Sequence, residues 1–300
     1  MSRPRPVYPG ATHLSTRCVH KRQLLLRPSK RINQLIEYTV AVLAERHGIE
    51  LHALCFESNH KHDVATDPNA RIVDFQRELH SIITRQVNCA YGEFGSLWAP
   101  GDSGRAECAD IETVLDKIIY TMANPVQDGL VAHGYSWPGV RRAWPAKDKV
   151  IERPADFFRD HEQGGKWPKT ATLRFTRPPG YDHLADDELA ALIRGGIEAR
   201  EVECRTQMRA EGRRFLGRKA CLAASRYAYP TTRRVQFGIN PKVAGRTEAR
   251  IQALEKLALF REHHDAARAA FNAGQRDVLF PHGTWKMRVY CGARCRPPPR

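Results

Sequence analysis

His60 and His62 stand two residues apart, at the end of a stretch whose apolar and polar residues alternate. The alternation predicts one strand that begins near Ile49 and continues through the histidines. Side chains two apart on a strand share a face, so the two imidazoles could bind one metal ion. Two histidines leave coordination positions open, as a catalytic metal requires. The simpler interpretation is a pair of ordinary surface histidines.

A second chemical pair is Tyr120 and Asn124, at the end of a predicted helix that Asp110 caps. Apolar residues recur with helical spacing from Ile111 to Met122, which indicates a buried stripe. Tyr120 and Asn124 lie off that stripe and are four apart, so they sit one above the other on one face. Pro125 is expected to end the helix directly after Asn124. The simpler interpretations are a tyrosine at the edge of the core and an asparagine that starts a turn.

The elements that would position these residues predict an α+β fold. A β-rich segment over 11–19 is expected to form the first strand. Ser29 is a good N-cap for a helix that runs to His47 and stops at Gly48. A second helix is expected to begin near Asn69.

The 300 residues carry a net charge of +15, and the isoelectric point is about 9.7. Such an excess favours a polyanionic partner, nucleic acid first and an anionic membrane surface second. No apolar run approaches the ~18 residues of a spanning helix, and the basic N-terminus lacks the apolar segment of a signal peptide. The eight scattered cysteines include no Cys-x-x-Cys pair, which favours reduced thiols. A cytoplasmic, nucleoid-associated protein without a membrane partner is expected.

Composition changes after about residue 145, which predicts a domain over 1–145 and a basic, mainly helical extension over 146–300. Residues 138–180 are rich in proline, glycine and charge, as in a linker. Helical patterns follow over 186–216 and 246–271, and a proline-rich tail ends the chain. From residue 201 onward 21 Lys and Arg stand against 8 Asp and Glu, so most of the excess charge lies here.

Several short segments together match a known pattern. They are Asn59-His60-Lys61-His62, the helix ending Tyr120-Thr121-Met122-Ala123-Asn124-Pro125-Val126, Tyr135-Ser136-Trp137, Pro9-Gly10-Ala11-Thr12-His13 with Arg17-Cys18, and Leu97-Trp98. This combination resembles the single-tyrosine HUH transposases, most closely the branch of REP-associated tyrosine transposases. The resemblance covers about residues 3–142.

The resemblance implies a ferredoxin-like antiparallel sheet with helices on one face, followed by the basic helical region. It also implies a divalent metal, Mg²⁺ or Mn²⁺, held by His60, His62 and Asn124. The Tyr120 hydroxyl would attack a phosphate of single-stranded DNA and form a 5′-phosphotyrosine link. The implied substrate is a DNA hairpin with a single-stranded flank, and the protein would act as a monomer or a homodimer.

Basic side chains are candidates for DNA contacts, although solvated charges are the simpler interpretation. Lys117 lies one turn before Tyr120 and could touch phosphate or lower the pKa of the tyrosine. The other candidates are Arg17, Arg71, Arg77, Arg85, Arg213, Arg214, Arg218 and Lys219.

Lys61 and Asp63 depart from the pattern, which usually has apolar residues at these positions. Two charges on the inner face of a central strand are costly unless they are paired. Either the strand lies at an edge, or the two charges pair locally, or the site has drifted, and Asp63 could instead orient a histidine. Drift motivates the alternative of a domesticated protein that binds hairpins without cutting. A second alternative is a phosphodiesterase in which a metal at His60 and His62 activates water.

Overall fold

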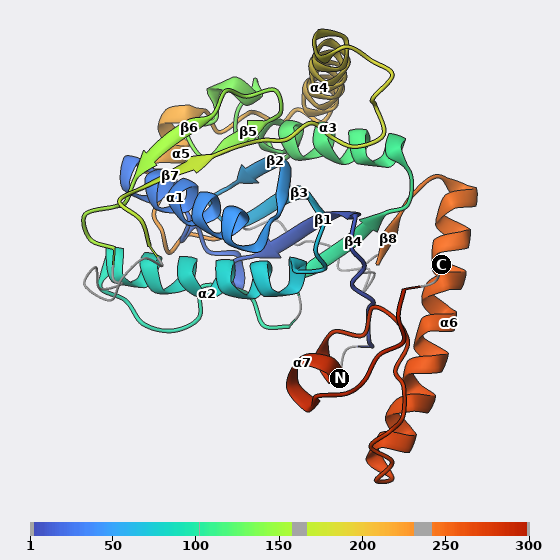
Figure 1. Cartoon of the computed structure of the whole chain (residues 1–300). Helices are drawn as coiled ribbons and strands as arrows, with labels where there is room; N and C mark the ends of the chain where they lie inside the picture. The colour runs from blue at the N-terminus through green and yellow to red at the C-terminus, as the bar shows by residue number, and fades with distance from the viewer. Residues whose placement is uncertain (1–2, 102, 158–166, 231–241, 299–300) are drawn as a thin grey trace.

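The computed structural model describes residues 3–101, 103–157, 167–230 and 242–298. Its centre is a six-stranded sheet with strand order β5-β2-β3-β1-β4-β8 (Figure 1). The elements of its first part, in chain order, are β1 (Ala11–Cys18), α1 (Lys30–His47), β2 (Glu50–Phe56), β3 (His60–Asp67), α2 (Ile72–Tyr91) and β4 (Gly104–Cys108). This order with antiparallel pairing is ferredoxin-like, so the predicted α+β fold is confirmed.

The sheet is extended at both edges by short strands. β5 (Arg141–Ala143) pairs antiparallel with β2, and β8 (Val243–Ala244) pairs parallel with β4. β3 therefore lies inside the sheet, between β1 and β2. Of the three alternatives for Lys61 and Asp63, the edge position of the histidine strand is therefore excluded.

The predicted single strand through the histidines is a hairpin. The chain turns back over Glu57–Asn59, and Phe56 on β2 pairs with Lys61 on β3. The turn closes with the Glu57 amide donating to the His60 carbonyl at 2.8 Å. A strand from Ile49 to Asp63 would also be far longer than the usual five or six residues. His60 and His62 still share a face, because both lie on β3.

Helices cover both faces of the sheet (Figure 1). α1 and α2 pack together on one face, as the ferredoxin-like arrangement predicts. A third helix, α3 (Ile111–Gln127), lies on the opposite face, so the expectation of helices on one face alone is corrected. Alternation along β3 shows the two sides: Lys61 contacts Gln76 of α2, and His62 contacts Tyr120 of α3.

The caps of the first and third helices were predicted correctly. The Ser29 and Asp110 side chains accept the amide N–H groups of Ile32 and Thr113, at 3.1 and 2.7 Å. The predicted stop at Asn124 is wrong, because α3 continues through Pro125 to Gln127. Pro125 is buried in the last turn of α3, where its missing amide N–H removes one helical hydrogen bond.

The second helix begins at Ile72, three residues after the predicted start. Its cap comes from the end of β3, where the buried Asp67 carboxylate accepts the amide N–H groups of Arg71 and Ile72 at 2.8 and 2.7 Å. A carboxylate at a helix N-terminus also meets the positive end of the helix dipole.

The residues after 145 pack closely on those before. The hairpin of β6 (Lys149–Glu152) and β7 (Thr170–Leu173) lies on α1, and α4 (Asp186–Ala210) lies on α3. The remaining elements are η1 (His20–Arg22), η2 (Gly134–Ser136), α5 (Arg218–Ala223), α6 (Thr247–Asn272) and α7 (Lys286–Cys291). Residues 138–157 and 167–180, which resemble a linker in composition, contribute Ile151, Leu173 and Phe175 to the main core. The division at residue 145 stays a prediction.

α6 stands apart from the body of the molecule, with the C-terminal segment and α7 beside it (Figure 1). The predicted helical patterns over 186–216 and 246–271 correspond to α4 and α6. None of the helices in the described ranges is long and apolar enough to cross a membrane.

Candidate active site

The four predicted chemical residues meet where β3 faces α3. The His60 and His62 rings lie with centroids 4.8 Å apart, and the His62 and Tyr120 rings with centroids 5.2 Å apart. Both ring pairs are nearly perpendicular. The Asn124 Nδ2 group lies 2.9 Å from His60 Nε2. The fold thus brings residues 60, 62, 120 and 124 into one group, with the His62 ring in contact with both neighbouring rings.

Each histidine ring is oriented through its Nδ1 atom. His60 Nδ1 lies 2.7 Å from Asn59 Oδ1, and His62 Nδ1 lies 2.9 Å from Thr16 Oγ1 on β1. An amide oxygen only accepts, so His60 Nδ1 carries the proton and Nε2 accepts from Asn124. Oxygen partners at Nδ1 that fix the ring and leave Nε2 for a ligand are typical of metal-binding histidines.

Two carboxylates belong to the same group and were missed in the sequence. Glu57 in the hairpin turn is 1% exposed and accepts from Asn124 Nδ2 at 2.7 Å. Asp128 follows α3 directly. One ligand atom each of Glu57, His60 and Asp128 lie within 4.8 Å of one another. The sequence did hold a signal for Asp128, because it follows Tyr120 and Asn124 at the same interval of four residues.

The electrostatics of this group favour a cation. Burial first, and then the charge of Asp128, hold the pKa of Glu57 well above its usual range, while the hydrogen bond from Asn124 lowers it. A buried carboxyl group beside a second carboxylate is destabilised when ionised, and a divalent cation between them would relieve this cost. A hollow of about 90 Å³ lies at this point, lined by Cys18, Arg22, Asn59, His60 and Asp128.

The side chains present therefore fit a divalent metal in two overlapping ways. The predicted set is His60, His62 and Asn124, and the set found in the structure is Glu57, His60 and Asp128. Carboxylate and amide oxygens are suitable ligands for Mg²⁺ and Mn²⁺, and an imidazole nitrogen can also bind Mn²⁺. His60 belongs to both sets, so its loss should remove the metal in either case.

Lys61 and Asp63 lie on the other face of β3. Both are fully buried, and they form an ion pair with each other. Gln76 of α2 completes the network: its Oε1 accepts from Lys61 Nζ at 3.0 Å, and its Nε2 donates to Asp63 at 2.9 Å. Local pairing is thus confirmed. Asp63 does not orient a histidine, since its partners are Lys61 and Gln76.

Some of the predicted DNA-contacting residues lie near the site. Lys117, on α3, forms an ion pair with Asp116 at 2.8 Å. The segment after α4 runs beside the C-terminal end of α3, where the Leu216 amide donates to Gly129 and Arg218 donates to the Ser136 carbonyl. This segment carries the exposed side chains of Arg213, Arg214, Arg218 and Lys219.

The other candidates lie on the α2 side of the sheet, away from Tyr120. Arg17 donates to the carbonyls of Gly101 and Ala99 at 2.6 and 3.0 Å, so it holds a loop. On α2, Asp74 is the ion-pair partner of both Arg71 and Arg77, at 3.3 and 3.1 Å. Arg85 is exposed on the same helix. These partners of Arg17, Arg71 and Arg77, namely Ala99, Gly101 and Asp74, lie outside the group of residues 60, 62, 120 and 124.

No family model matches the chain, and no curated protein matches it. Among solved structures, a REP-associated tyrosine transposase bound to a REP hairpin is 20% identical with a TM-score of 0.39, over 46% of this chain and 81% of that one. A candidate transposase from Deinococcus radiodurans R1 is 19% identical with a TM-score of 0.28, over 35% of this chain and 84% of that one.

Proposed function

We propose that the protein is a metal-dependent transposase or nickase that cleaves and rejoins single-stranded DNA through Tyr120. The observation that carries the proposal is the contact of the His62 ring with both the His60 and the Tyr120 rings, at 4.8 and 5.2 Å. A nucleophile and candidate metal ligands from two separate elements thus share one small space. This is the arrangement that attack on a metal-polarised phosphate needs.

A divalent metal, Mg²⁺ or Mn²⁺, would be held by His60 together with His62 and Asn124 or with the two carboxylates. When bound, it would polarise the scissile phosphate. Asn124 presents its Nδ2 group to Glu57 and His60. Its carboxamide would have to turn over to offer Oδ1 as a ligand, which would free Glu57 to ligate as well.

The covalent step is carried by Tyr120. Its hydroxyl oxygen attacks phosphorus and gives up its proton to water, the bond from phosphorus to the 3′ oxygen breaks, and the leaving 3′ oxygen takes up a proton from water. The DNA 5′ end stays attached to Tyr120 as a phosphodiester, so a later 3′-hydroxyl can displace the tyrosine without ATP. The basic segment of Arg213, Arg214, Arg218 and Lys219 would hold the DNA backbone beside the C-terminal end of α3.

The observation that suggested the alternative, a protein that binds hairpins without cutting them, has another explanation in the structure. The alternative depended on Lys61 and Asp63 as signs of a drifted site, yet both lie on the α2 face and pair with each other. Lys61 is therefore not placed to repel a metal at His60. The phosphodiesterase alternative retains one supporting observation, the buried Glu57 carboxyl group near His60, which could serve as a base for water.

The deciding experiment is covalent trapping. The protein is incubated with labelled single-stranded hairpins from the DNA that flanks its own gene, with Mg²⁺, Mn²⁺ or EDTA, and run on denaturing gels. A metal-dependent adduct is expected that disappears in Tyr120→Phe and in His60→Ala. Tyr135→Phe is the matched control, because Tyr135 is 79% exposed and lies outside the site.

Each outcome has one meaning. Cleavage that persists in Tyr120→Phe would make water the nucleophile and refute the proposal. Hairpin binding in EDTA without cleavage in any metal would establish the binding protein instead. Adducts that also disappear in Tyr135→Phe would show that the loss is not specific to Tyr120.

A further inference from the structure

A basic cavity lies on the α2 side of the sheet, opposite the face that carries Tyr120. It has a volume of about 520 Å³ and opens between the N-terminal arm (residues 3–9), α2, β4 and the α6–α7 region. Among the described residues, seven Lys and Arg side chains line it and no Asp or Glu does. The seven are Arg3, Arg5, Arg17, Arg77, Arg105, Arg268 and Lys286. A cavity with this charge is built for an anion.

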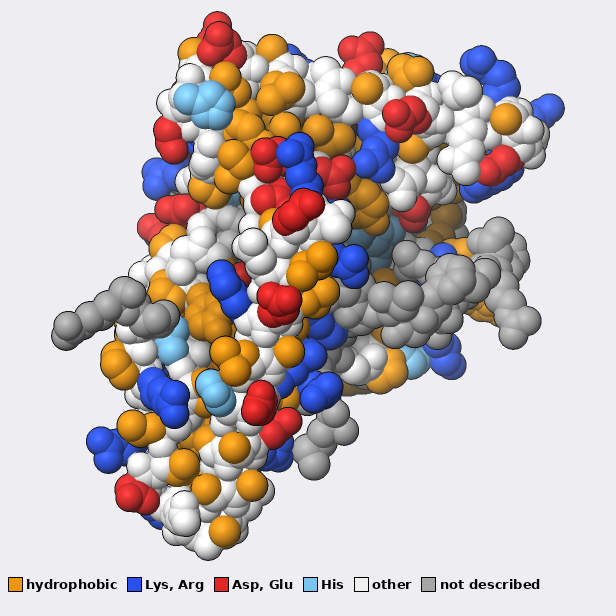
Figure 2. Space-filling model, turned by 90° about the vertical axis from the view of Figure 1, so that its right-hand side faces the viewer, with side chains coloured by type: hydrophobic (Ala, Val, Ile, Leu, Met, Phe, Trp, Pro, Cys, Tyr) orange, Lys and Arg blue, Asp and Glu red, His pale blue; other side chains and the backbone are white. Residues whose placement is uncertain are grey.

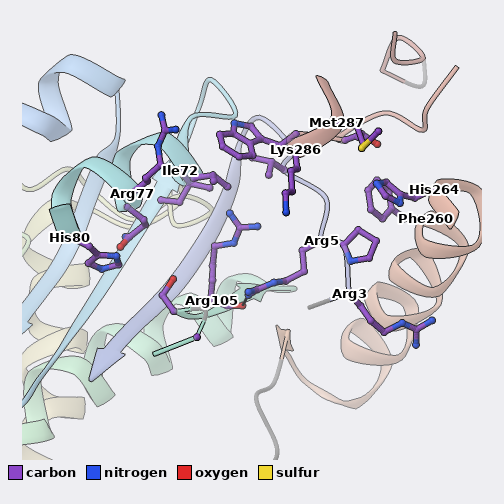
Figure 3. Close-up of a pocket in the computed structure, with 18 of the residues that line it drawn as sticks. Arg3, Arg5, Ile72, Arg77, His80, Arg105, Phe260, His264, Lys286 and Met287 are labelled. Atoms are coloured by element: carbon purple, nitrogen blue, oxygen red, sulfur yellow. Dashed lines mark hydrogen bonds between the residues drawn. The ribbon is translucent and has the colours of Figure 1, made fainter. Parts of the chain in front are cut away.

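The cationic side chains come from separate parts of the fold and extend into one space (Figure 3). Arg5 belongs to the N-terminal arm, Arg105 to β4 and Lys286 to α7, and their charged ends point toward one another. Arg5 donates to the Arg105 carbonyl at 3.2 Å, which fixes the arm against β4. Tertiary structure has therefore gathered like charges that repel one another.

The environment of Arg105 shows the cost of this arrangement. Burial and the nearby charge of Arg5 lower the pKa of Arg105 to about 10, although Asp67 and Glu107 oppose the shift. Burial and the Arg5 charge both disfavour the charged guanidinium, and a bound anion would favour it.

Trp285 also belongs to the cavity lining. Trp285, at the start of α7, is 9% exposed, and its Nε1 atom has no hydrogen-bond partner. An indole nitrogen can only donate, and a buried donor without an acceptor is costly. The cationic lining therefore favours a ligand rich in acceptor oxygens.

Figure 2 views the molecule from the side of α6 and shows Lys and Arg side chains interspersed with Asp and Glu on that face. The cavity lining differs, because the charged side chains it holds among the described residues are all Lys and Arg. Several cations in one cavity match a ligand with several negative groups better than a single small anion.

We propose that this cavity binds a chain of adjacent phosphate groups. The chain could be the backbone of a nucleic-acid strand, held on the sheet face opposite Tyr120, or a free polyphosphate. A cavity of several hundred Å³ accommodates a ligand of that size. The nucleic-acid form rests on the proposed function, whereas the polyphosphate form does not.

The test removes two of the lining cations, in the variant Lys286→Ala/Arg268→Ala. The matched control, Lys30→Ala/Arg250→Ala, removes the same charge from exposed positions outside the cavity lining. All proteins carry Tyr120→Phe and are kept in EDTA, so cleavage and metal play no part. Two ligands are used: labelled oligo(dT), followed by fluorescence anisotropy over a salt series, and inorganic tripolyphosphate, followed by the melting temperature.

We expect the cavity variant to bind oligo(dT) about 10-fold more weakly, with a slope of log Kd against log salt that is shallower by about 1.4, or 0.7 for each lost contact to a single strand. Tripolyphosphate should raise the melting temperature of the parent protein and of the control pair, and much less that of the cavity variant. A tripolyphosphate effect without an oligo(dT) effect would identify the ligand as a free phosphate chain. If the cavity and control variants behave alike with both ligands, the proposal is overturned.

Discussion

Lys61→Met should be among the most damaging single substitutions in the protein. Lys61 is 0% exposed and Asp63 is 1% exposed, and the two charges neutralise each other. Removing the ammonium group leaves the Asp63 carboxylate buried with only the Gln76 amide to stabilise it. Breaking a buried ion pair in this way costs about 3–5 kcal/mol of the free energy of unfolding. Domains typically have only about 5–15 kcal/mol in total.

Replacing the whole network should cost far less than breaking it. The triple variant Lys61→Met/Asp63→Val/Gln76→Leu leaves no buried charge and no unpaired amide, and it approximately conserves volume. Such replacements are often neutral or stabilising. We therefore expect the triple variant to lie within about 1.5 kcal/mol of the parent protein, the range of tolerated core replacements.

Urea unfolding followed by circular dichroism measures these differences. The slope of the unfolding free energy against urea should be unchanged, so that a shift of the midpoint reports stability alone. Lys30→Met, the same substitution at an exposed lysine, should change the free energy of unfolding by less than about 0.5 kcal/mol. The reasoning fails if Lys61→Met costs less than about 1 kcal/mol, or if the triple variant is as unstable as the single one.

Three further predictions follow from other buried groups. His13 is buried with neither ring nitrogen hydrogen-bonded, and its pKa is lowered from 6.5 to about 3, mainly by burial. Between these two pH values the unfolded chain binds one proton more than the folded protein. The free energy of unfolding therefore falls by about 1.4 kcal/mol for each pH unit as the pH drops. In His13→Gln the fitted slope of unfolding free energy against pH from 4.5 to 6 should be smaller by that amount, and an unchanged slope would refute the assignment. Asp67→Ala removes the acceptor at the start of α2 and should cost about 2 kcal/mol in urea unfolding, with Asp67→Asn losing less; equal losses would argue against a role as acceptor. Mn²⁺ should raise the melting temperature of the parent protein but not that of His60→Ala. Two double variants separate the ligand sets, Glu57→Gln/Asp128→Asn and His62→Ala/Asn124→Ala, because only the variant that removes true ligands should lose the Mn²⁺ shift. A shift that survives in His60→Ala would exclude both sets.

Local sequence signals predicted α1 and α3 well because the capping residues of these helices directly adjoin them in the sequence. Ser29 and Gly48 bound α1, and Asp110 begins α3 where the apolar stripe starts. The cap of α2 could not be predicted in this way, because Asp67 closes the helix from the end of a strand. Its carboxylate reaches the helix only once β3 has been placed in the sheet.

The hairpin was missed because its turn, Glu57-Ser58-Asn59, contains neither glycine nor proline and interrupts an alternation that continues on both sides. That error hid Glu57, which appeared to be a strand residue and not a turn residue facing Asn124. Asp128 was hidden by the assumption that Pro125 ends α3. Without the last turn of the helix, the spacing from Tyr120 through Asn124 to Asp128 loses its structural meaning.

The two faces of β3 separate two kinds of chemistry. His60 and His62 face α3 and the proposed nucleophile, while Lys61 and Asp63 face α2, on the side where Arg17 and Gln76 border the basic cavity. Because the sheet lies between the basic cavity and Tyr120, the cavity can hold a DNA strand without contacting the reacting phosphate. Lys286→Ala/Arg268→Ala should therefore weaken DNA binding but leave the rate of adduct formation at saturating DNA unchanged. Tyr120→Phe should leave DNA binding unchanged and abolish adduct formation. A cavity variant that slows the chemical step would show that the two faces act as one site.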